Sequence, residues 1–275
     1  VQKLGILGAG MMGQGIAYAS AMAGMDVILK DVSQEAAEKG KAYSDMLLSK
    51  RVARGKMTED KKTAVLSLIK PTAENEDLAG CDLIIEAVFE DVGLKHKVTA
   101  ETETYLAENG VFGSNTSTLP ITELAKGSAK PENFIGIHFF SPVDKMPLVE
   151  IIVGEKTSDE ALAKAFDYSQ QIRKTPIVVN DSRGFFTSRV FGTYCDEGAA
   201  LLKEGVDPVL IENLAKQTGM PVGPLAVVDE VSQQLSFKVG QTNLKLDEAR
   251  GENYVGMYIA GDVSMRLVEE FDRKG

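Results

Sequence analysis

Short apolar runs alternate with longer amphipathic stretches along the first two thirds of the chain. The apolar runs cover residues 4–7, 25–30, 69–70, 83–88, 111–114, 134–138, 148–153 and 176–179. A run that is apolar almost throughout, such as residues 83–88, is typical of a parallel strand buried on both faces. Strands that alternate with helices predict a doubly wound α/β sheet.

Helical patterns lie between these strands at first and then replace them. Residues 33–54 form a long one with Ser33 as the expected N-cap, and residues 94–108 form a charged amphipathic one. The strand signal then stops, and helical patterns cover residues 185–204 and 208–218 and continue less regularly to residue 271. We therefore predict a sheet domain over residues 1–182 and a smaller all-helical domain over residues 183–275.

Three glycines lie in the turn between the first strand and the first helix. Gly8, Gly10 and Gly13 follow the pattern G-x-G-x-x-G. The first permits a tight turn, the second lets a pyrophosphate approach the backbone, and the third lets the helix pack closely on the strand. The N–H groups at the helix N-terminus, around Met11 and Met12, would bind the phosphates. The pattern predicts a Rossmann-type dinucleotide-binding domain, and the alternative is a glycine-rich turn in an unrelated α/β domain.

The second strand leads directly into an acidic residue, Asp31. A carboxylate roughly 20 residues after the glycine turn suits the hydroxyls of an adenosine ribose and repels a 2′-phosphate. We therefore expect the cofactor to be NAD rather than NADP.

The composition excludes two classes of main partner. The chain has 275 residues, 44% of them apolar and 25% charged, and its formal net charge of -10 argues against nucleic acid or an anionic membrane. No apolar run approaches the ~20 residues of a membrane span. Cys81 and Cys195 form no disulfide framework, so we expect a cytoplasmic protein. The first strand follows Val1 almost at once and no Met precedes it, so we expect a piece of a longer polypeptide.

Two histidines are available for acid–base chemistry. His96 lies in a charged helical stretch and is interpreted as a surface residue, whereas His138 ends an apolar strand, where α/β ligand sites form. From this position His138 is either a catalytic base or a structural histidine. Glu150 lies inside another apolar strand. It either pairs with a buried histidine, because an unpaired buried charge is costly, or lies on an exposed strand face.

Six segments occur in an order that resembles L-3-hydroxyacyl-CoA dehydrogenases. They are the glycine turn and residues 85–90, 114–118, 138–143, 147–150 and 180–185. Residues 51–56 and 131–180 are especially similar to the dehydrogenase part of bacterial multifunctional β-oxidation α-subunits. The resemblance implies NAD-dependent oxidation of an L-3-hydroxyacyl-CoA thioester to the 3-ketoacyl-CoA in fatty acid β-oxidation.

The resemblance assigns catalytic roles by position. It makes His138 the base, Glu150 its partner, and Ser117 an active-site serine that also contacts the substrate. Ser188 occupies the position of a family asparagine and can still donate a hydrogen bond. The Ser117 segment by itself is also typical of a capped loop before a helix.

Binding roles follow in the same way. Glu90 and Lys95 fall where the family contacts the nicotinamide side of the cofactor, and Asn115 is a further expected cofactor contact. Lys50 and Arg54 fall on a basic helix where the family contacts coenzyme A. Without the resemblance, these residues are typical of a charged loop and of an exposed basic helix face.

The resemblance also implies partners and leaves alternatives open. It implies a homodimer through the helical domain, and a hydratase domain and a thiolase partner in the full-length protein. One alternative is a dehydrogenase of small hydroxy acids without coenzyme A. Another is a catalytically impaired relative, or a fragment that needs its missing parts. That alternative is favoured by Ser188 and by the end of the chain at Gly275, before the family's terminal glycine- and aromatic-rich motif.

Overall fold

The computed structural model describes residues 1–231 of the chain, and the helical patterns expected between there and residue 271 lie outside the described residues. The chain divides into two compact units. The first comprises residues 1–186, and the second begins at Thr187.

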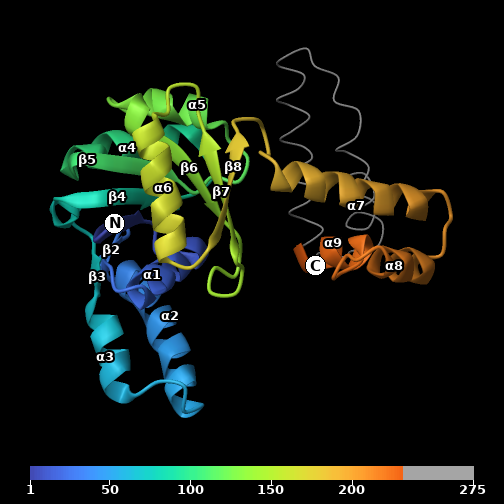
Figure 1. Cartoon of the computed structure of the whole chain (residues 1–275), viewed down its shortest axis with the longest axis horizontal. Coiled ribbons are helices and arrows are strands. Elements are labelled where there is room, and N and C mark those ends of the chain that lie inside the picture. The colour runs from blue at the N-terminus through green and yellow to red at the C-terminus, as the bar shows by residue number, and fades with distance from the viewer. Residues whose placement is uncertain (232–275) are drawn as a thin grey trace. The chain divides into compact units, whose positions relative to one another are not determined.

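One eight-stranded sheet forms the centre of the first unit (Figure 1). The strand order is β3-β2-β1-β4-β5-β6-β7-β8, and all neighbours are parallel except β6 and β7, which are antiparallel. The predicted doubly wound, Rossmann-type sheet is therefore confirmed. The strands are β1 (Lys3–Leu7), β2 (Asp26–Lys30), β3 (Ile69–Thr72), β4 (Cys81–Glu86), β5 (Leu106–Ser114), β6 (Phe134–Phe139), β7 (Leu148–Val153) and β8 (Thr175–Asn180).

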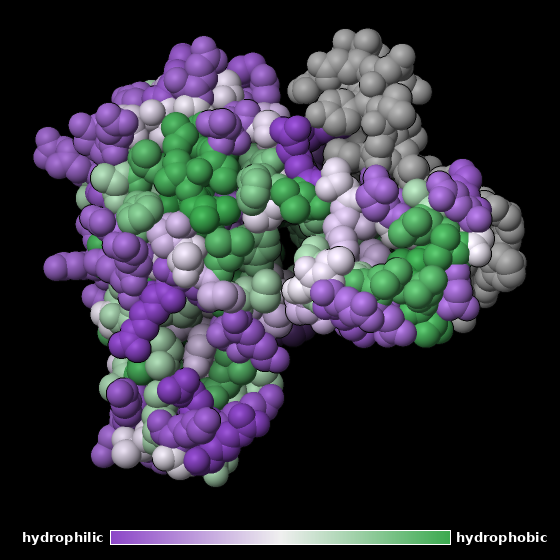
Figure 2. All heavy atoms as spheres, turned by 45° about the vertical axis from the view of Figure 1, so that its right-hand side comes forward, coloured by the Kyte–Doolittle hydropathy of each residue, from purple (hydrophilic) through white to green (hydrophobic). Residues whose placement is uncertain are grey.

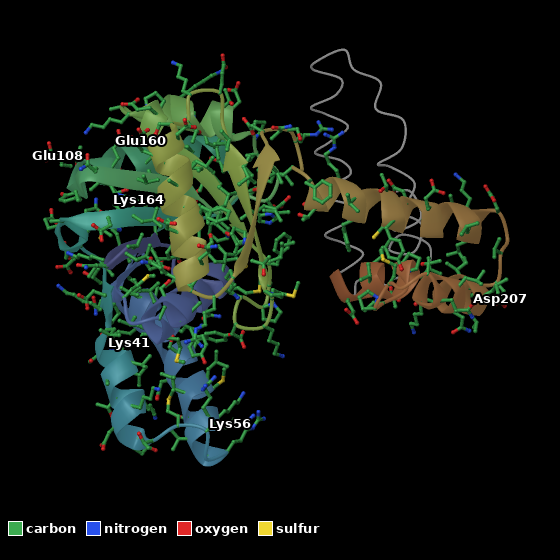
Figure 3. All side chains as sticks on the ribbon, in the orientation of Figure 1. Lys41, Lys56, Glu108, Glu160, Lys164 and Asp207 are labelled. Atoms are coloured by element: carbon green, nitrogen blue, oxygen red, sulfur yellow. The ribbon has the colours of Figure 1, made fainter. Side chains whose placement is uncertain are left out.

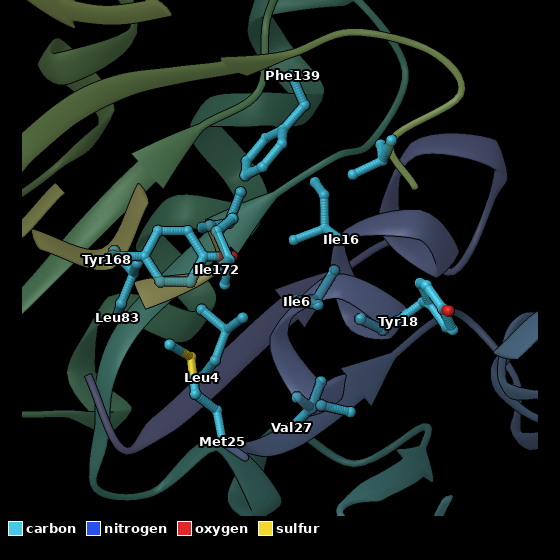
Figure 4. Packing of buried hydrophobic residues seen from close by; sticks show 14 of the residues in the cluster. Leu4, Ile6, Ile16, Tyr18, Met25, Val27, Leu83, Phe139, Tyr168 and Ile172 are labelled. Atoms are coloured by element: carbon cyan, nitrogen blue, oxygen red, sulfur yellow. The ribbon is translucent and has the colours of Figure 1, made fainter. Parts of the chain in front are cut away.

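Helices cover both faces of this sheet. Side chains of β1 and β2 pack on one face with Ile16 of α1 and Tyr168 of α6, a cluster that Figure 4 shows from close by. On the other face, Leu124 of α5 and Val98 of α4 pack with Phe112 of β5. The helices are α1 (Met11–Met22), α2 (Gln34–Ala53), α3 (Glu59–Ser67), α4 (Val92–Thr102), α5 (Ile121–Leu124) and α6 (Asp159–Gln171).

The long helix α2 begins where the sequence predicts and extends beyond the sheet. Ser33 is its N-cap, and the Ser33 hydroxyl accepts a hydrogen bond from the Ala36 N–H at 3.2 Å. With 20 residues, α2 is about 30 Å long. Its outer half pairs with α3, where Lys62 and Asp45 form an ion pair of 2.8 Å (Figure 1).

The predicted helix over residues 94–108 is wrong in its second half. α4 ends at Thr102, a short 3-10 turn follows, and β5 begins at Leu106. Leu106 pairs with Cys81 of β4, so tertiary pairing overrides the local helical pattern. The helix expected from residue 185 begins two residues later, because Gly184 and Phe185 have positive φ angles of 73° and 48°.

The second unit is helical in its described part. Its helices are α7 (Thr187–Lys203), α8 (Pro208–Gln217) and α9 (Pro224–Val231). Asp207, labelled in Figure 3, caps α8 by accepting the N–H groups of Val209 and Leu210. α7 and α9 approach closely at Gly198, where a Cβ would lie 2.5 Å from the Pro224 ring.

Candidate active site

The glycine turn after β1 has the geometry of a phosphate-binding turn. Gly8 has φ +94°, and a Cβ on it would lie 2.8 Å from the Ala87 carbonyl oxygen. A Cβ on Gly13 would lie 1.8 Å from the Gly8 carbonyl oxygen. A Cβ on Gly10 would meet nothing within 4 Å. The protein's own packing therefore requires the first and third glycines, whereas the space at Gly10 is open to a ligand.

Backbone donors face the same space. Gly10 is the N-cap of α1 and provides no side-chain cap, and the first intrahelical bond runs from the Gln14 N–H to the Gly10 carbonyl at 2.9 Å. The N–H groups of Met11, Met12 and Gly13 precede that bond, so they have no intrahelical acceptor. Free donors at the positive end of a helix suit the pyrophosphate of a dinucleotide.

Asp31 lies just past β2 and is tied to the glycine turn. One carboxylate oxygen accepts the Ala9 N–H at 2.6 Å, and the other accepts the Val32 N–H at 2.6 Å. A carboxylate oxygen has two acceptor sites, so each retains one for a ribose hydroxyl. The residues present therefore fit the adenosine half of NAD.

The second feature of the site is a histidine–glutamate pair. His138 and Glu150 are directly opposite each other in the antiparallel register of β6 and β7. His138 Nδ1 lies 2.7 Å from Glu150 Oε2, and both residues are buried, with 6% and 0% of their surfaces exposed. The alternative that Glu150 lies on an exposed strand face is therefore wrong.

A backbone N–H group fixes Glu150, and two aromatic rings pack against His138. Glu150 Oε1 accepts the Phe186 N–H at 3.1 Å, and the positive φ angles of Gly184 and Phe185 form the preceding turn. The rings of Phe140 and Phe185 flank the His138 imidazole at centroid distances of 4.6 and 6.1 Å. A carboxylate at Nδ1 selects the tautomer that is protonated there, so Nε2 is the basic nitrogen.

The third feature is a charge cluster formed by Glu86 and Lys95, which are buried, and Glu90. Lys95 Nζ lies 2.9 Å from each Glu86 oxygen and 3.3 Å from Glu90 Oε2. Glu86 is fully buried, Lys95 is 2% exposed, and Glu90 is partly open to solvent. The Lys95 ammonium group is therefore paired with two protein carboxylates. Of the three side chains in the cluster, Glu90 is the one exposed to solvent.

The two carboxylates have different electrostatic environments. Burial raises the pKa of Glu86, against the opposing effects of Lys95, the Ser114 hydroxyl and the Val88 N–H. Burial would also raise the pKa of Glu90, but the Lys95 charge and hydrogen bonds from residues 116–118 outweigh it. The pKa of Glu90 is consequently below its ordinary value.

Residues 114–118 connect the cluster to the histidine. Glu90 Oε1 accepts the Thr116 hydroxyl at 2.6 Å and the Ser117 N–H at 2.9 Å, and the Ser117 hydroxyl lies 3.3 Å from it. Asn115 Oδ1 accepts the N–H of Phe139, next to His138, at 2.9 Å. Asn115 and Ser117 therefore share a segment anchored to both β6 and the cluster.

The remaining predicted residues lie elsewhere. Lys50 is on the outer half of α2 and Arg54 is its C-cap, and both are exposed. Lys56 marks the tip of this helical pair in Figure 3, and Figure 2 shows hydrophilic residues gathered there. Ser188 belongs to the first turn of α7 in the second unit, and its role stays a prediction.

Glu86 was missed as a functional candidate. It ends the apolar strand β4, so it carries the same signal that pointed to Glu150, a carboxylate in an apolar run. Thr116 was also missed as an individual residue, although it is fully buried and bonded to Glu90. Its environment depends on contacts between separate strands.

Comparison with known protein families identifies both parts of the chain. Residues 3–182 match the family model "3-hydroxyacyl-CoA dehydrogenase, NAD binding domain", and residues 184–271 match the C-terminal domain of that family. The chain belongs to the 3-hydroxyacyl-CoA dehydrogenase family. Its first domain is accordingly an NAD-binding domain.

Curated relatives of the family are longer than this chain. The fatty acid oxidation complex subunit alpha of Idiomarina loihiensis is 45% identical over 232 residues, which are 84% of this chain and 32% of that protein. The subunit of the same name from Pseudomonas syringae pv. syringae is 43% identical over 231 residues, with the same coverage. The chain thus spans about a third of the length of these relatives.

Solved structures show the same fold. The (S)-3-hydroxybutyryl-CoA dehydrogenase of Ralstonia eutropha is 33% identical with a TM-score of 0.89, over 98% of this chain and 94% of that chain. The 3-hydroxybutyryl-CoA dehydrogenase of Escherichia coli K12 is 30% identical with a TM-score of 0.90, over 100% of this chain and 57% of that chain.

The described part of the chain lacks two other classes of feature, a membrane-spanning helix and a metal-binding cluster. Within residues 1–231, no helix combines the length and the apolar character that a membrane crossing needs. The same residues contain no group of three or more His, Cys, Asp or Glu side chains placed to hold a metal ion.

Proposed function

We propose that this chain oxidises L-3-hydroxyacyl-CoA to 3-ketoacyl-CoA with NAD, as part of fatty acid β-oxidation. The observation that carries the proposal is the buried pair of His138 and Glu150, 2.7 Å apart, in the same sheet as a dinucleotide-binding turn. A base and a dinucleotide site in one sheet suit the removal of a proton and a hydride from the same alcohol.

The proton step follows from the tautomer of His138. Nε2 would accept the proton of the 3-hydroxyl group, and the imidazole would become an imidazolium ion. Glu150, which accepts the Nδ1–H bond, would stabilise that ion and keep the ring in place. Because the Phe186 N–H holds the other Glu150 oxygen, the carboxylate is already oriented before the substrate binds.

The cofactor would be held by both halves of the sheet. The glycine turn would bind the pyrophosphate and Asp31 the adenosine ribose, while Glu90 and Asn115 would contact the nicotinamide half. Bound NAD would supply the hydride acceptor. Lys95 would act on the cofactor through Glu90, since its ammonium group is buried between two carboxylates.

Ser117 would orient the substrate oxygen near His138. Its hydroxyl group has one proton, and Glu90 Oε1 lies 3.3 Å from that hydroxyl. Donation to the substrate would require this proton to turn away from Glu90. Substrate binding would therefore change the hydrogen bond that the Ser117 hydroxyl makes with Glu90, the carboxylate on the cofactor side.

The proposal extends to the partners, the cellular location and the oligomeric state of the protein. The names of the longer relatives favour a place in a fatty acid oxidation complex. The family resemblance adds a hydratase domain, a thiolase partner and a cytoplasmic location to this proposal. A homodimer through the helical unit is favoured by apolar side chains exposed on α8, a patch visible in Figure 2. These are Val209, Leu210 and Leu214, which are 64%, 48% and 48% exposed.

The proposal is tested by acetoacetyl-CoA-dependent oxidation of NADH. We expect His138→Ala and Glu150→Gln to lose about 10²- to 10⁴-fold in kcat while NADH binding stays near that of the wild type. His96→Gln is the matched control, because the His96 ring hydrogen-bonds the Glu123 carbonyl and no residue of the site, and it should keep full activity. A wild-type protein that binds NADH but reduces no acyl-CoA thioester would contradict the proposed substrate.

A further inference from the structure

The cluster of Glu86, Lys95 and Glu90 contains two carboxylates and one ammonium group. Both carboxylates contact the same Lys95 Nζ, and no other lysine or arginine in the described residues forms an ion pair with them. With both carboxylates ionised, the cluster carries one net negative charge. Two of its members are almost completely buried, so solvent screens this charge poorly.

The hydrogen bonds around Glu86 favour its ionised form. Its Oε1 faces Lys95 and the Ser114 hydroxyl, and its Oε2 faces Lys95 and the Val88 N–H at 3.2 Å. The Ser114 oxygen accepts the Thr116 N–H at 3.3 Å, consistent with the Ser114 proton pointing to Glu86. Four donor contacts already reach the Glu86 oxygens, and a protonated Glu86 would add a fifth donor with no acceptor. The surrounding hydrogen bonds therefore favour the ionised carboxylate.

Glu90 is ionised for a similar reason. Its Oε1 accepts N–H groups from Ser117 and Thr118 and the hydroxyl group of Thr116. All of these groups are donors toward a carboxylate. The net negative charge is therefore built into the hydrogen bonding of the site.

The strand order places this charge between the phosphate-binding turn and His138. Glu86 and Ser114 are the last residues of β4 and β5, which lie between β1 and β6 in the strand order. On the β1 side, Gly8 of the phosphate-binding turn packs directly against Ala87. On the β6 side, Asn115 binds the backbone next to His138. The adenosine-side carboxylate Asp31 lies beyond β1, so the hydride-accepting half of a bound dinucleotide belongs on the cluster's side.

We propose that the cluster of Glu86, Lys95 and Glu90 favours the oxidised cofactor over the reduced one. The nicotinamide ring carries a positive charge in NAD⁺ and none in NADH, so a fixed negative charge beside it stabilises the oxidised form selectively. The inference rests on the proposed function, since it assumes an NAD-dependent reaction. In this proposal Glu86 both holds Lys95 and contributes negative charge that stabilises NAD⁺ relative to NADH.

Calorimetric dissociation constants for NAD⁺ and NADH test the inference without turnover. In Glu86→Gln, which keeps the shape and removes the charge, we expect the ratio Kd(NAD⁺)/Kd(NADH) to rise about threefold to tenfold. Ser114→Ala is the matched control, because it removes the Ser114 hydrogen bond to Glu86 Oε1 and keeps all three charges of the cluster. Its ratio should stay within about twofold of the wild type.

A second variant keeps the inference testable if Glu86→Gln does not fold. Glu90→Gln removes the other charge at a partly exposed position, and the ratio should rise there too. Equal losses of affinity for both cofactors in these variants, with the ratio unchanged, would overturn the charge effect and leave a purely positioning role. Failure of the wild-type protein to bind either cofactor would contradict the proposed function instead.

Discussion

Gly13 lies so close to Gly8 that a Cβ on Gly13 would stand 1.8 Å from the Gly8 carbonyl oxygen. The start of α1 can therefore pack on the end of β1 only while residue 13 has no side chain. Gly10, three residues earlier, has open space around its Cα. The two glycines of one motif thus serve different purposes, the fold and the ligand.

This difference predicts different defects for two similar substitutions. Gly10→Ala should leave the melting temperature within about 2 °C of the wild type but weaken NADH binding by about tenfold or more, because the new methyl group occupies ligand space. Gly13→Ala should destabilise the fold itself, because the backbone must move away. Melting curves and NADH titrations of both variants check this. A destabilised Gly10→Ala with unchanged NADH affinity would contradict the assignment of that space to the phosphates.

Asp31 should determine the choice between NAD and NADP. Its carboxylate would repel a 2′-phosphate, and Asp31→Asn removes that charge while one amide oxygen can still accept a backbone N–H. We expect the preference for NAD over NADP to narrow by about tenfold in this variant. Asp26→Asn, at the exposed start of β2, is the control and should keep the wild-type preference. Equal affinities for NAD and NADP in the wild-type protein would contradict the role of Asp31.

Glu90 should contribute to stability in a pH-dependent way. The Lys95 charge and the donors of residues 116–118 overcome the opposing effect of burial and lower the pKa of Glu90 in the folded state. An acid with a lowered folded-state pKa stabilises the fold fully above its unfolded pKa of about 4.3 and loses that contribution as the pH falls through the folded value.

The melting temperatures of the wild type and Glu90→Gln should therefore differ at neutral pH and converge as the pH falls through the lowered folded-state pKa of Glu90. Glu108→Gln, which changes an exposed glutamate labelled in Figure 3, is the control and should melt with the wild type at neutral pH. A difference between wild type and Glu90→Gln that stays constant down to pH 3 would mean that packing, and not charge, causes it.

Lys50 and Arg54 should act on the nucleotide end of the substrate. Both are exposed on the outer part of α2, so we expect the double variant Lys50→Ala, Arg54→Ala to lower kcat/KM for acetoacetyl-CoA by about tenfold through lost phosphate attraction. A truncated thioester without the nucleotide should be turned over normally, and added salt should shrink the difference between variant and wild type. Lys126→Ala, on a different surface segment, is the control. Equal losses on both thioesters would assign α2 a role in folding only.

Much of the site is visible in local sequence. The spacing of Gly8, Gly10 and Gly13 and the acidic residue after the second strand predict a dinucleotide site, because turn geometry and helix ends depend on neighbouring residues. The apolar runs also predict every strand of the sheet, since a strand buried on both faces has a recognisable composition. His138 and Glu150 were each noticeable as polar residues in such runs.

Tertiary structure decided which of these residues meet. His138 faces Glu150 because β6 and β7 are antiparallel and in one register, and a shift of one residue would turn the pair apart. Lys95 joins Glu86 to Glu90 because α4 packs its ammonium group at the ends of β4 and β5. Strand order, register and shared partners are interactions between distant parts of the chain, so the composition of a single segment carries no record of them.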